Sequence, residues 1–176
     1  MVAAIAFTGI GICATAADLN YMRSATLIQA EVAKRGAKPV VDELFQDQNT
    51  WAQVLKDIET GNADWIATAK SLAVGTDAGS SETLDVALFY ALEKSPELVL
   101  DATSENRIDF VCSSNFTIDR PADDAALKAL RTRIHAVKSV ATPSLHAKRD
   151  ACLKGLRQAE QIWQNPAKKP SPSAQQ

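Results

Sequence analysis

Apolar residues recur every three or four positions through almost every segment of this chain after residue 20. That spacing places them on one face of an α-helix. Residues that stop or cap helices separate the segments, and these are Gly36, Pro39, Gly61, Asn62 and Gly75. We expect Gly75 to end its helix in the left-handed conformation that glycine adopts readily. The sequence therefore predicts an all-α fold, a compact bundle of about six to eight helices arranged as helical hairpins.

Two of the predicted hairpins resemble each other at an offset of 33 residues. The matched pairs are Trp51 with Leu84, Leu55 with Leu88, Ile58 with Ala91, Asn62 with Ser95, Trp65 with Leu98, and Ile66 with Val99. In both copies a capping residue lies between two helices, and Pro96 follows Ser95 at the first helical position. This period is typical of helical-hairpin repeats. Two copies are fewer than a solenoid needs, so a chance likeness between two hairpins is the alternative interpretation.

The segment 103–121, TSENRIDFVCSSNFTIDRP, breaks the helical pattern. Ile108, Phe110 and Cys112 alternate with other residues in the way that extended structure favours. The sequence therefore predicts one irregular segment near 103–121, followed by a helix over 122–140.

The first sixteen residues, MVAAIAFTGIGICATA, are uncharged and end in the small-x-small pattern ATA. They predict a secretory signal peptide over 1–16, cleaved before Ala17. No lysine or arginine precedes the apolar run, so we expect the signal to be truncated, and a buried N-terminal helix is the alternative. The run is too short to span a bilayer, and the bulky Ile12 argues against a lipid on Cys13. We therefore expect a periplasmic protein with no stable membrane anchor.

Removal of the signal peptide would leave two cysteines, Cys112 and Cys152. In an oxidising compartment an even pair predicts a disulfide. Cys152 lies on the apolar stripe of the last predicted helix, which Pro143 opens, so a bridge would tie the irregular segment to the helical body. A metal site is not expected, because neither His135 nor His146 has another histidine or cysteine at helical spacing.

Charge is distributed unevenly along the chain. Up to Asp124 there are 9 basic and 19 acidic residues, whereas from Ala125 onward there are 10 basic and 2 acidic residues. The simplest interpretation is that the last two helices have solvated, cationic outer faces, and head-to-tail association into a homodimer is the alternative. Nucleic acid is not an expected partner, because no aromatic residues are interleaved among these cations. We expect a single domain over 17–164 and a disordered tail over 165–176, which is rich in proline and serine.

No motif of a known active site is present in the sequence. The chain lacks GxSxG, HExxH, a Walker loop and a dinucleotide-binding fingerprint. We therefore expect neither a cofactor nor catalytic activity. An active site assembled from distant residues would leave no such pattern, so an enzyme with an unrecognised site remains a third hypothesis.

The most distinctive polar stretch is GTDAGSSETLD, residues 75–85. Asp77 can form an Asx-turn, Ser80 or Ser81 can cap the next helix, and Glu82 complements the dipole of that helix. A cation-binding loop would need several carboxylates at fixed spacing, and before its last residue, Asp85, the stretch offers only Asp77 and Glu82. We interpret the stretch as the junction of two helices that also exposes polar groups to a partner.

The signal-like MVAAIAFTGIGICATAA, the hairpins around ETGNADW and EKSPELVL, and the two cysteines together give a layout that can be compared with known families. This layout resembles small exported all-helical immunity proteins, such as those that neutralise type VI secretion amidase effectors. The resemblance implies a non-catalytic inhibitor that plugs the substrate cleft of a cell-wall hydrolase with a loop between helices, often as a dimer. Asp77, Ser80, Ser81 and Glu82 are then the candidate plug. The alternative hypothesis is an envelope scaffold or assembly factor that binds a peptide or protein.

Overall fold

The computed structural model describes residues 24–113 and 123–164. Within these ranges the chain forms helices and no β-strand, which confirms the predicted all-α class. The α-helices are α1 (Ala25–Arg35), α2 (Ala37–Gln46), α3 (Gln48–Glu59), α4 (Ala63–Ala73), α5 (Ala78–Ala91), α6 (Pro96–Ala102), α7 (Ile108–Cys112), α8 (Asp124–Lys138) and α9 (His146–Gln164). Two 3-10 turns, η2 (Glu105–Arg107) and η4 (Pro143–Leu145), lead into α7 and α9. The last helical unit therefore begins at Pro143 as expected, but with a 3-10 turn.

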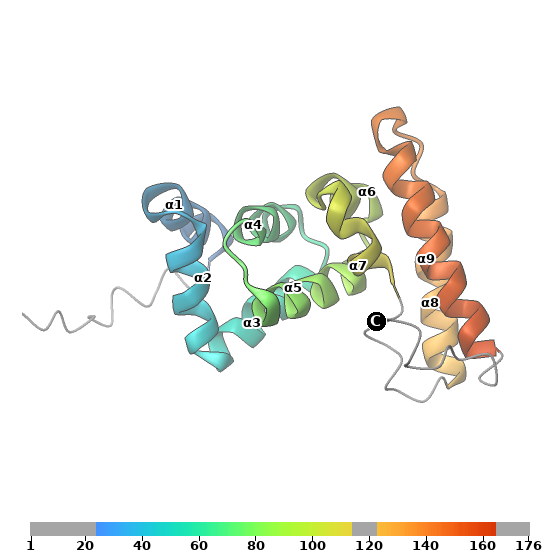
Figure 1. Cartoon of the computed structure of the whole chain (residues 1–176), viewed down its shortest axis with the longest axis horizontal. Helices are drawn as coiled ribbons and strands as arrows, with labels where there is room; N and C mark the ends of the chain where they lie inside the picture. The colour runs from blue at the N-terminus through green and yellow to red at the C-terminus, as the bar shows by residue number, and fades with distance from the viewer. Residues whose placement is uncertain (1–23, 114–122, 165–176) are drawn as a thin grey trace, which may run out of the picture.

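The first seven helices form two rows along the long axis of the molecule (Figure 1). One row contains α1, α4 and α6, and the other contains α3, α5 and α7, with α2 joining the rows at one end. The last two helices, α8 and α9, pack against each other at the opposite end, where α9 also contacts α7. The side chains between the rows form one apolar core, and its largest fully buried members include Ile28, Leu44, Ile58, Leu72, Phe89, Leu92 and Leu100.

The two rows give a structural meaning to the offset of 33 residues. Equivalent helices of the two hairpins are neighbours, because α3 packs against α5 and α4 packs against α6. The turns also meet, since the Ser95 hydroxyl donates to the Gly61 carbonyl at 2.6 Å. Asn62 caps α4 as expected, whereas the Ser95 hydroxyl makes no cap hydrogen bond to α6. The hairpins therefore stack like units of a short solenoid.

The expectation of extended structure around Cys112 is wrong. Residues 108–112 form α7, in which Ile108, Val111 and Cys112 are buried at helical spacing. Phe110 is half-exposed and lies outside this face, with the Arg107 guanidinium 4.9 Å from its ring centroid. The alternating pattern gave a wrong prediction because it required Phe110 to face the core. Residues 114–121 of the irregular segment lie outside the described ranges.

Gly75 has a different role from the left-handed helix stop that its position suggests. Among the described residues, positive φ angles occur only at Gly36 and Gly61. Gly75 is buried, and a Cβ at its position would lie 2.4 Å from the carbonyl carbon of Ala37 and from the amide nitrogen of Lys38. Glycine is needed here because the backbone of the α4–α5 connection touches the backbone at the start of α2.

The basic C-terminal half is not wholly solvated. Arg133 of α8 is only 7% exposed, although the charge pattern placed it on an outer face. Its guanidinium carbon lies 4.6 Å from the ring centroid of Phe89 and 5.0 Å from that of Tyr90. This cation–π stacking joins α8 to α5. Glu93 lies 3.7 Å from the same guanidinium and supplies the nearest carboxylate.

The predicted disulfide between Cys112 and Cys152 is present and links α7 to α9. The two Cα atoms lie 5.0 Å apart, and both residues are fully buried. Gly155 permits this close approach, because a Cβ there would lie 2.7 Å from the Cys112 carbonyl oxygen. The predicted signal peptide at 1–16 and the predicted tail at 165–176 lie outside the described residues. Each helix in the described ranges is too short or too polar to span a bilayer.

Candidate binding site at the α4–α5 connection

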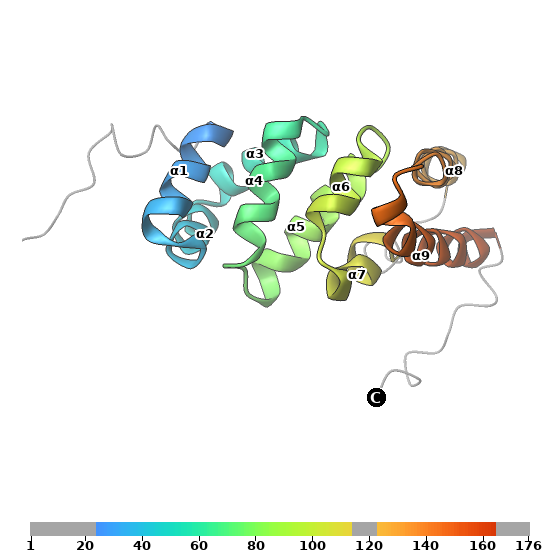
Figure 2. The same ribbon diagram turned by 90° about the horizontal axis from the view of Figure 1, so that it is seen from above.

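Most of GTDAGSSETLD is helical. The connection between α4 and α5 is only residues 74–77, and α5 begins at Ala78. Figure 2 shows this connection on the same side of the molecule as α7. Val74, at the start of the connection, has 87% of its surface exposed and is the most exposed large apolar residue in the described ranges. The connection therefore presents an apolar side chain at the edge of the helical body.

Local hydrogen bonds hold the connection in place. The Gly75 amide donates to the Leu72 carbonyl at 2.8 Å, and the Thr76 hydroxyl donates to the Ala73 carbonyl at 2.9 Å. Both bonds satisfy carbonyl groups at the C-terminal end of α4. Together with the contact of Gly75 against the start of α2, they fix the connection on both sides.

Asp77 and Ser80 form a capping box that starts α5. The Asp77 carboxylate accepts from the Ser80 amide at 3.2 Å and from the Ser80 hydroxyl at 2.7 Å, while the Asp77 amide donates to that hydroxyl oxygen at 2.9 Å. These bonds hold the pKa of the Asp77 carboxyl below its usual value, and the bond from the Ser80 hydroxyl has the largest effect. The N-cap is thus Asp77, whereas the sequence suggested Ser80 or Ser81. Ser80 is buried, so its hydroxyl serves this cap.

The two remaining candidate residues face different surroundings. Glu82 is exposed in the second turn of α5, beyond the first turn in which a carboxylate complements the helix dipole, so that expectation is wrong. Ser81 is half-buried, and its hydroxyl donates to the Ala78 carbonyl at 3.2 Å. Of the four candidate plug residues, Asp77 and Glu82 are therefore the ones whose side chains reach solvent most freely.

We expect Asp77→Ala to lower the melting temperature by about 2–4 °C, because the first turn of α5 loses its acceptor. Glu82→Ala should leave the melting temperature unchanged, since no hydrogen bond or ion pair of Glu82 is present among the described residues. Thermal unfolding followed by circular dichroism would measure both. Equal effects of the two substitutions would contradict the capping role of Asp77.

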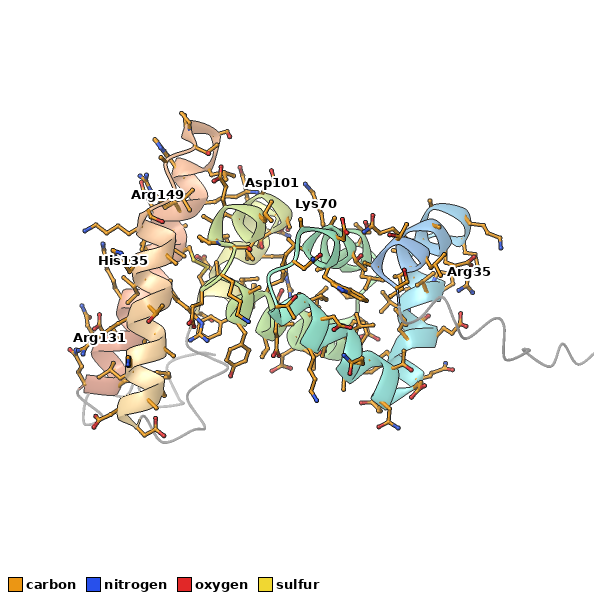
Figure 3. All side chains as sticks on the ribbon, turned by 180° about the vertical axis from the view of Figure 1, so that it is seen from behind. Arg35, Lys70, Asp101, Arg131, His135 and Arg149 are labelled. Atoms are coloured by element: carbon orange, nitrogen blue, oxygen red, sulfur yellow. A yellow bond between two sulfur atoms is a disulfide. The ribbon has the colours of Figure 1, made fainter. Side chains whose placement is uncertain are left out.

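A groove of about 600 Å³ adjoins the connection, between α4, α5, α6 and η2. Its lining residues are Ala69, Lys70, Ala73, Val74, Thr76, Ser81, Leu84, Asp85, Leu88, Asp101, Ala102, Thr103, Ser104, Arg107 and Lys148. At its rim Lys70 forms an ion pair with Asp101 at 3.0 Å, and both side chains are labelled in Figure 3. The Lys148 ammonium group donates to the carbonyls of Leu100 at 3.0 Å and Thr103 at 2.6 Å. Lys148 thereby joins the beginning of α9 to the end of α6.

Asp85 and Arg107 form an ion pair in the groove. Asp85 is 5% exposed, and burial raises the pKa of its carboxyl to about 6 against the opposing influence of Arg107. Arg107 also donates to the Ser81 carbonyl at 3.4 Å. Sequence reasoning missed this pair because its members are 22 residues apart. The sequence did contain one signal of the buried pair. Asp85, a carboxylate, directly follows Leu84 on the apolar face of its helix.

The raised pKa of the buried Asp85 carboxyl should make the stability of the protein depend on pH. Its folded pKa lies above the unfolded value near 4, so the folded state binds a proton more tightly and loses relative stability as pH rises from 4 to about 6. We expect the free energy of unfolding of the wild type, relative to Asp85→Asn, to fall by about 2–3 kcal/mol over that window. Urea unfolding of both proteins at intervals between pH 4 and pH 7 would measure it. If the free energy of unfolding of the wild type, relative to Asp85→Asn, rose with pH instead, the attraction of Arg107 would outweigh burial.

The described residues contain no group of three or more histidine, cysteine or acidic side chains that could hold a metal ion. His135 is exposed on α8, and the His146 Nε2 atom lies 3.1 Å from the Ala141 carbonyl oxygen.

No protein-family model matches the chain, and no curated protein or solved structure is significantly similar to it.

Proposed function

We propose that this chain is a non-catalytic binding protein of the periplasm that inhibits a secreted cell-wall-degrading effector. The observation that carries the proposal is Val74, which is 87% exposed on a connection fixed by hydrogen bonds and by the packing of Gly75. The connection would enter the substrate cleft of the effector. Val74 would supply the apolar contact, and the exposed carboxylates of Asp77 and Glu82 would lie beside it.

A fixed connection suits an inhibitor because ordering a mobile loop on binding costs conformational entropy. Here the capping box, the hydrogen bonds to the end of α4 and the backbone contact with Ala37 and Lys38 order the segment before any partner arrives. An exposed apolar side chain beside charged groups also has the composition of an interface, with an apolar centre and a polar rim.

Two further features support an exported protein. The disulfide of Cys112 and Cys152 is typical of oxidising compartments, and the uncharged run at 1–16 is typical of a signal peptide. An inhibitor of a cell-wall hydrolase would act in that compartment.

The test uses the full chain as bait in a periplasmic extract, followed by an assay of the captured hydrolase on peptidoglycan. We expect the wild type to block hydrolysis and Val74→Asp to weaken the inhibition at least tenfold, because a charge replaces the apolar contact. Leu98→Asp is the matched control, since Leu98 is a half-exposed apolar residue on α6 and does not line the groove beside the connection. Melting temperatures would verify that both variants are folded.

Equal inhibition by the wild type and Val74→Asp would refute the α4–α5 connection as the plug. Failure of the wild type to inhibit any hydrolase that it captures would refute the inhibitor function itself.

The groove favours a second candidate function, an envelope scaffold or assembly factor that holds a peptide. Leu84 and Leu88 line it beside charged groups, a combination suited to an extended peptide with apolar side chains. Ser104→Trp would obstruct the groove from its exposed rim at the start of η2, on a different segment from Val74. A scaffold would lose its partner with this variant and would not alter catalysis by any captured enzyme, whereas an inhibitor acting through Val74 would retain its partner.

A further inference from the structure

The charges of the molecule are separated along its long axis. The helical body, residues 24–113, contains 7 basic and 15 acidic residues, whereas residues 123–164 contain 8 basic and 4 acidic residues. The second group forms α8, η4 and α9, which stand together at one end of the molecule (Figure 1). The net charge therefore changes from −8 in the body to +4 at this end.

The exposed basic residues of α8 lie on one face. Lys128, Arg131, His135 and Lys138 are spaced by three or four positions, which aligns them along the helix, and all four are exposed. The buried residues of α8, Leu130, Arg133 and Val137, lie on the opposite face. We call the four exposed residues the basic stripe, and it is about 15 Å long. Figure 3 shows Arg131 and His135 on the outer edge of the molecule, at the end opposite Arg35.

Among the residues that the structure describes, one member of the basic stripe is neutralised by a neighbour. Arg131 pairs with Glu160 of α9 at 2.7 Å. Lys128 and Lys138 have no ion pair with any residue that the structure describes. Their charges are therefore available to an external anion.

Within the described ranges, no exposed large apolar side chain accompanies these charges. The exposed large apolar residues of the described chain are Leu27, Val74, Leu98 and Phe110, and all of them belong to the body. Protein interfaces are usually organised around such a side chain, most often an aromatic one. The described residues of the α8–α9 end lack this kind of anchor, so their chemistry fits a surface of repeated anionic groups better than it fits a protein.

We propose that the basic stripe docks this protein reversibly, end-on, to the surface of a bilayer rich in anionic phospholipid. A straight row of cations on one helix matches a flat array of headgroup phosphates. A nucleic acid strand would require a cationic groove with aromatic side chains, and the stripe has neither. The acidic body is repelled by the same surface, so the long axis points away from the membrane. This orientation leaves the α4–α5 connection accessible to a partner.

The test is cosedimentation of the full chain with vesicles of 30% phosphatidylglycerol and 70% phosphatidylcholine at about 50 mM salt. We expect binding that disappears at about 500 mM salt and is absent with pure phosphatidylcholine. Lys128→Gln with Lys138→Gln should reduce the partition coefficient about 25-fold, because each cation near such a surface contributes about fivefold. Lys56→Gln with Lys94→Gln is the matched control, since it removes the same charge from exposed positions in the body. The control should bind within about twofold of the wild type.

Three results would overturn the proposal. The first is a wild type that does not bind the anionic vesicles at low salt. The second is an equal loss of binding in both double variants, which would assign the effect to net charge alone. The third is tighter binding to a DNA duplex than to vesicles at the same phosphate concentration, which would assign the stripe to nucleic acid. Melting temperatures equal to that of the wild type would establish that the variants are folded.

Discussion

Replacing both Cys112 and Cys152 by alanine should lower the free energy of unfolding by about 4 kcal/mol. The bridge spans 40 residues, and removing it frees the unfolded chain to explore many more conformations. It also removes the covalent cross-link between α7 and α9. The measurement is urea unfolding of the full chain on a Cys13→Ser background, so that no third thiol can exchange.

Reduction of the unsubstituted bridge provides the control for this experiment. Both sulfur atoms are fully buried, so the alanine variant also loses packing that the reduced protein keeps. The reduced protein should therefore lose nearly as much stability as the double variant. A loss below about 1 kcal/mol on reduction would contradict the structural role of the bridge.

The second large effect is expected from Gly75→Ala. A methyl group at this position would meet backbone atoms of Ala37 and Lys38 at 2.4 Å, and backbone cannot move aside as a flexible side chain can. We expect a loss of about 2–3 kcal/mol in the free energy of unfolding. Alanine would reduce the conformational entropy of the unfolded chain, and φ at Gly75 is not positive, so the predicted loss depends on the backbone contact alone.

Gly79→Ala is the matched control for Gly75→Ala. Gly79 lies in the first turn of α5, four residues further along the chain, and a Cβ there would be 3.5 Å from the Phe45 ring. This is an ordinary contact distance, so the substitution should be neutral or stabilising by up to about 1 kcal/mol. A loss of stability of the same size in both variants would mean that the packing of Gly75 against α2 is not the cause.

The sequence was informative about the helices because their pattern is local. Gly36, Gly61 and Asn62 lie at helix boundaries as expected, and each of those signals acts within one turn of the chain. Cys112 and Cys152 could also be paired, because they were the only two cysteines after the apolar N-terminal run. The error at α7 arose where five residues are too few for a helical period to be distinguished from an alternating one.

The candidate site was less predictable because it depends on contacts between distant residues. The polar character of residues 75–85 indicated a junction, but not that Ser80 would be buried within a capping box. The groove is formed by residues from α4 to α9, so its shape cannot be derived from any one segment. Arg133 illustrates the same limit, because the aromatic rings that stack on its guanidinium belong to another helix.

The bridge between α7 and α9 has a consequence for the survival of the molecule under proteases. It closes a covalent ring that includes α8 and residues 114–122. A single peptide bond cut anywhere in that ring would produce two fragments that remain one molecule. Secreted proteases could therefore cleave one peptide bond there without releasing either fragment, and α9 would remain packed against α7.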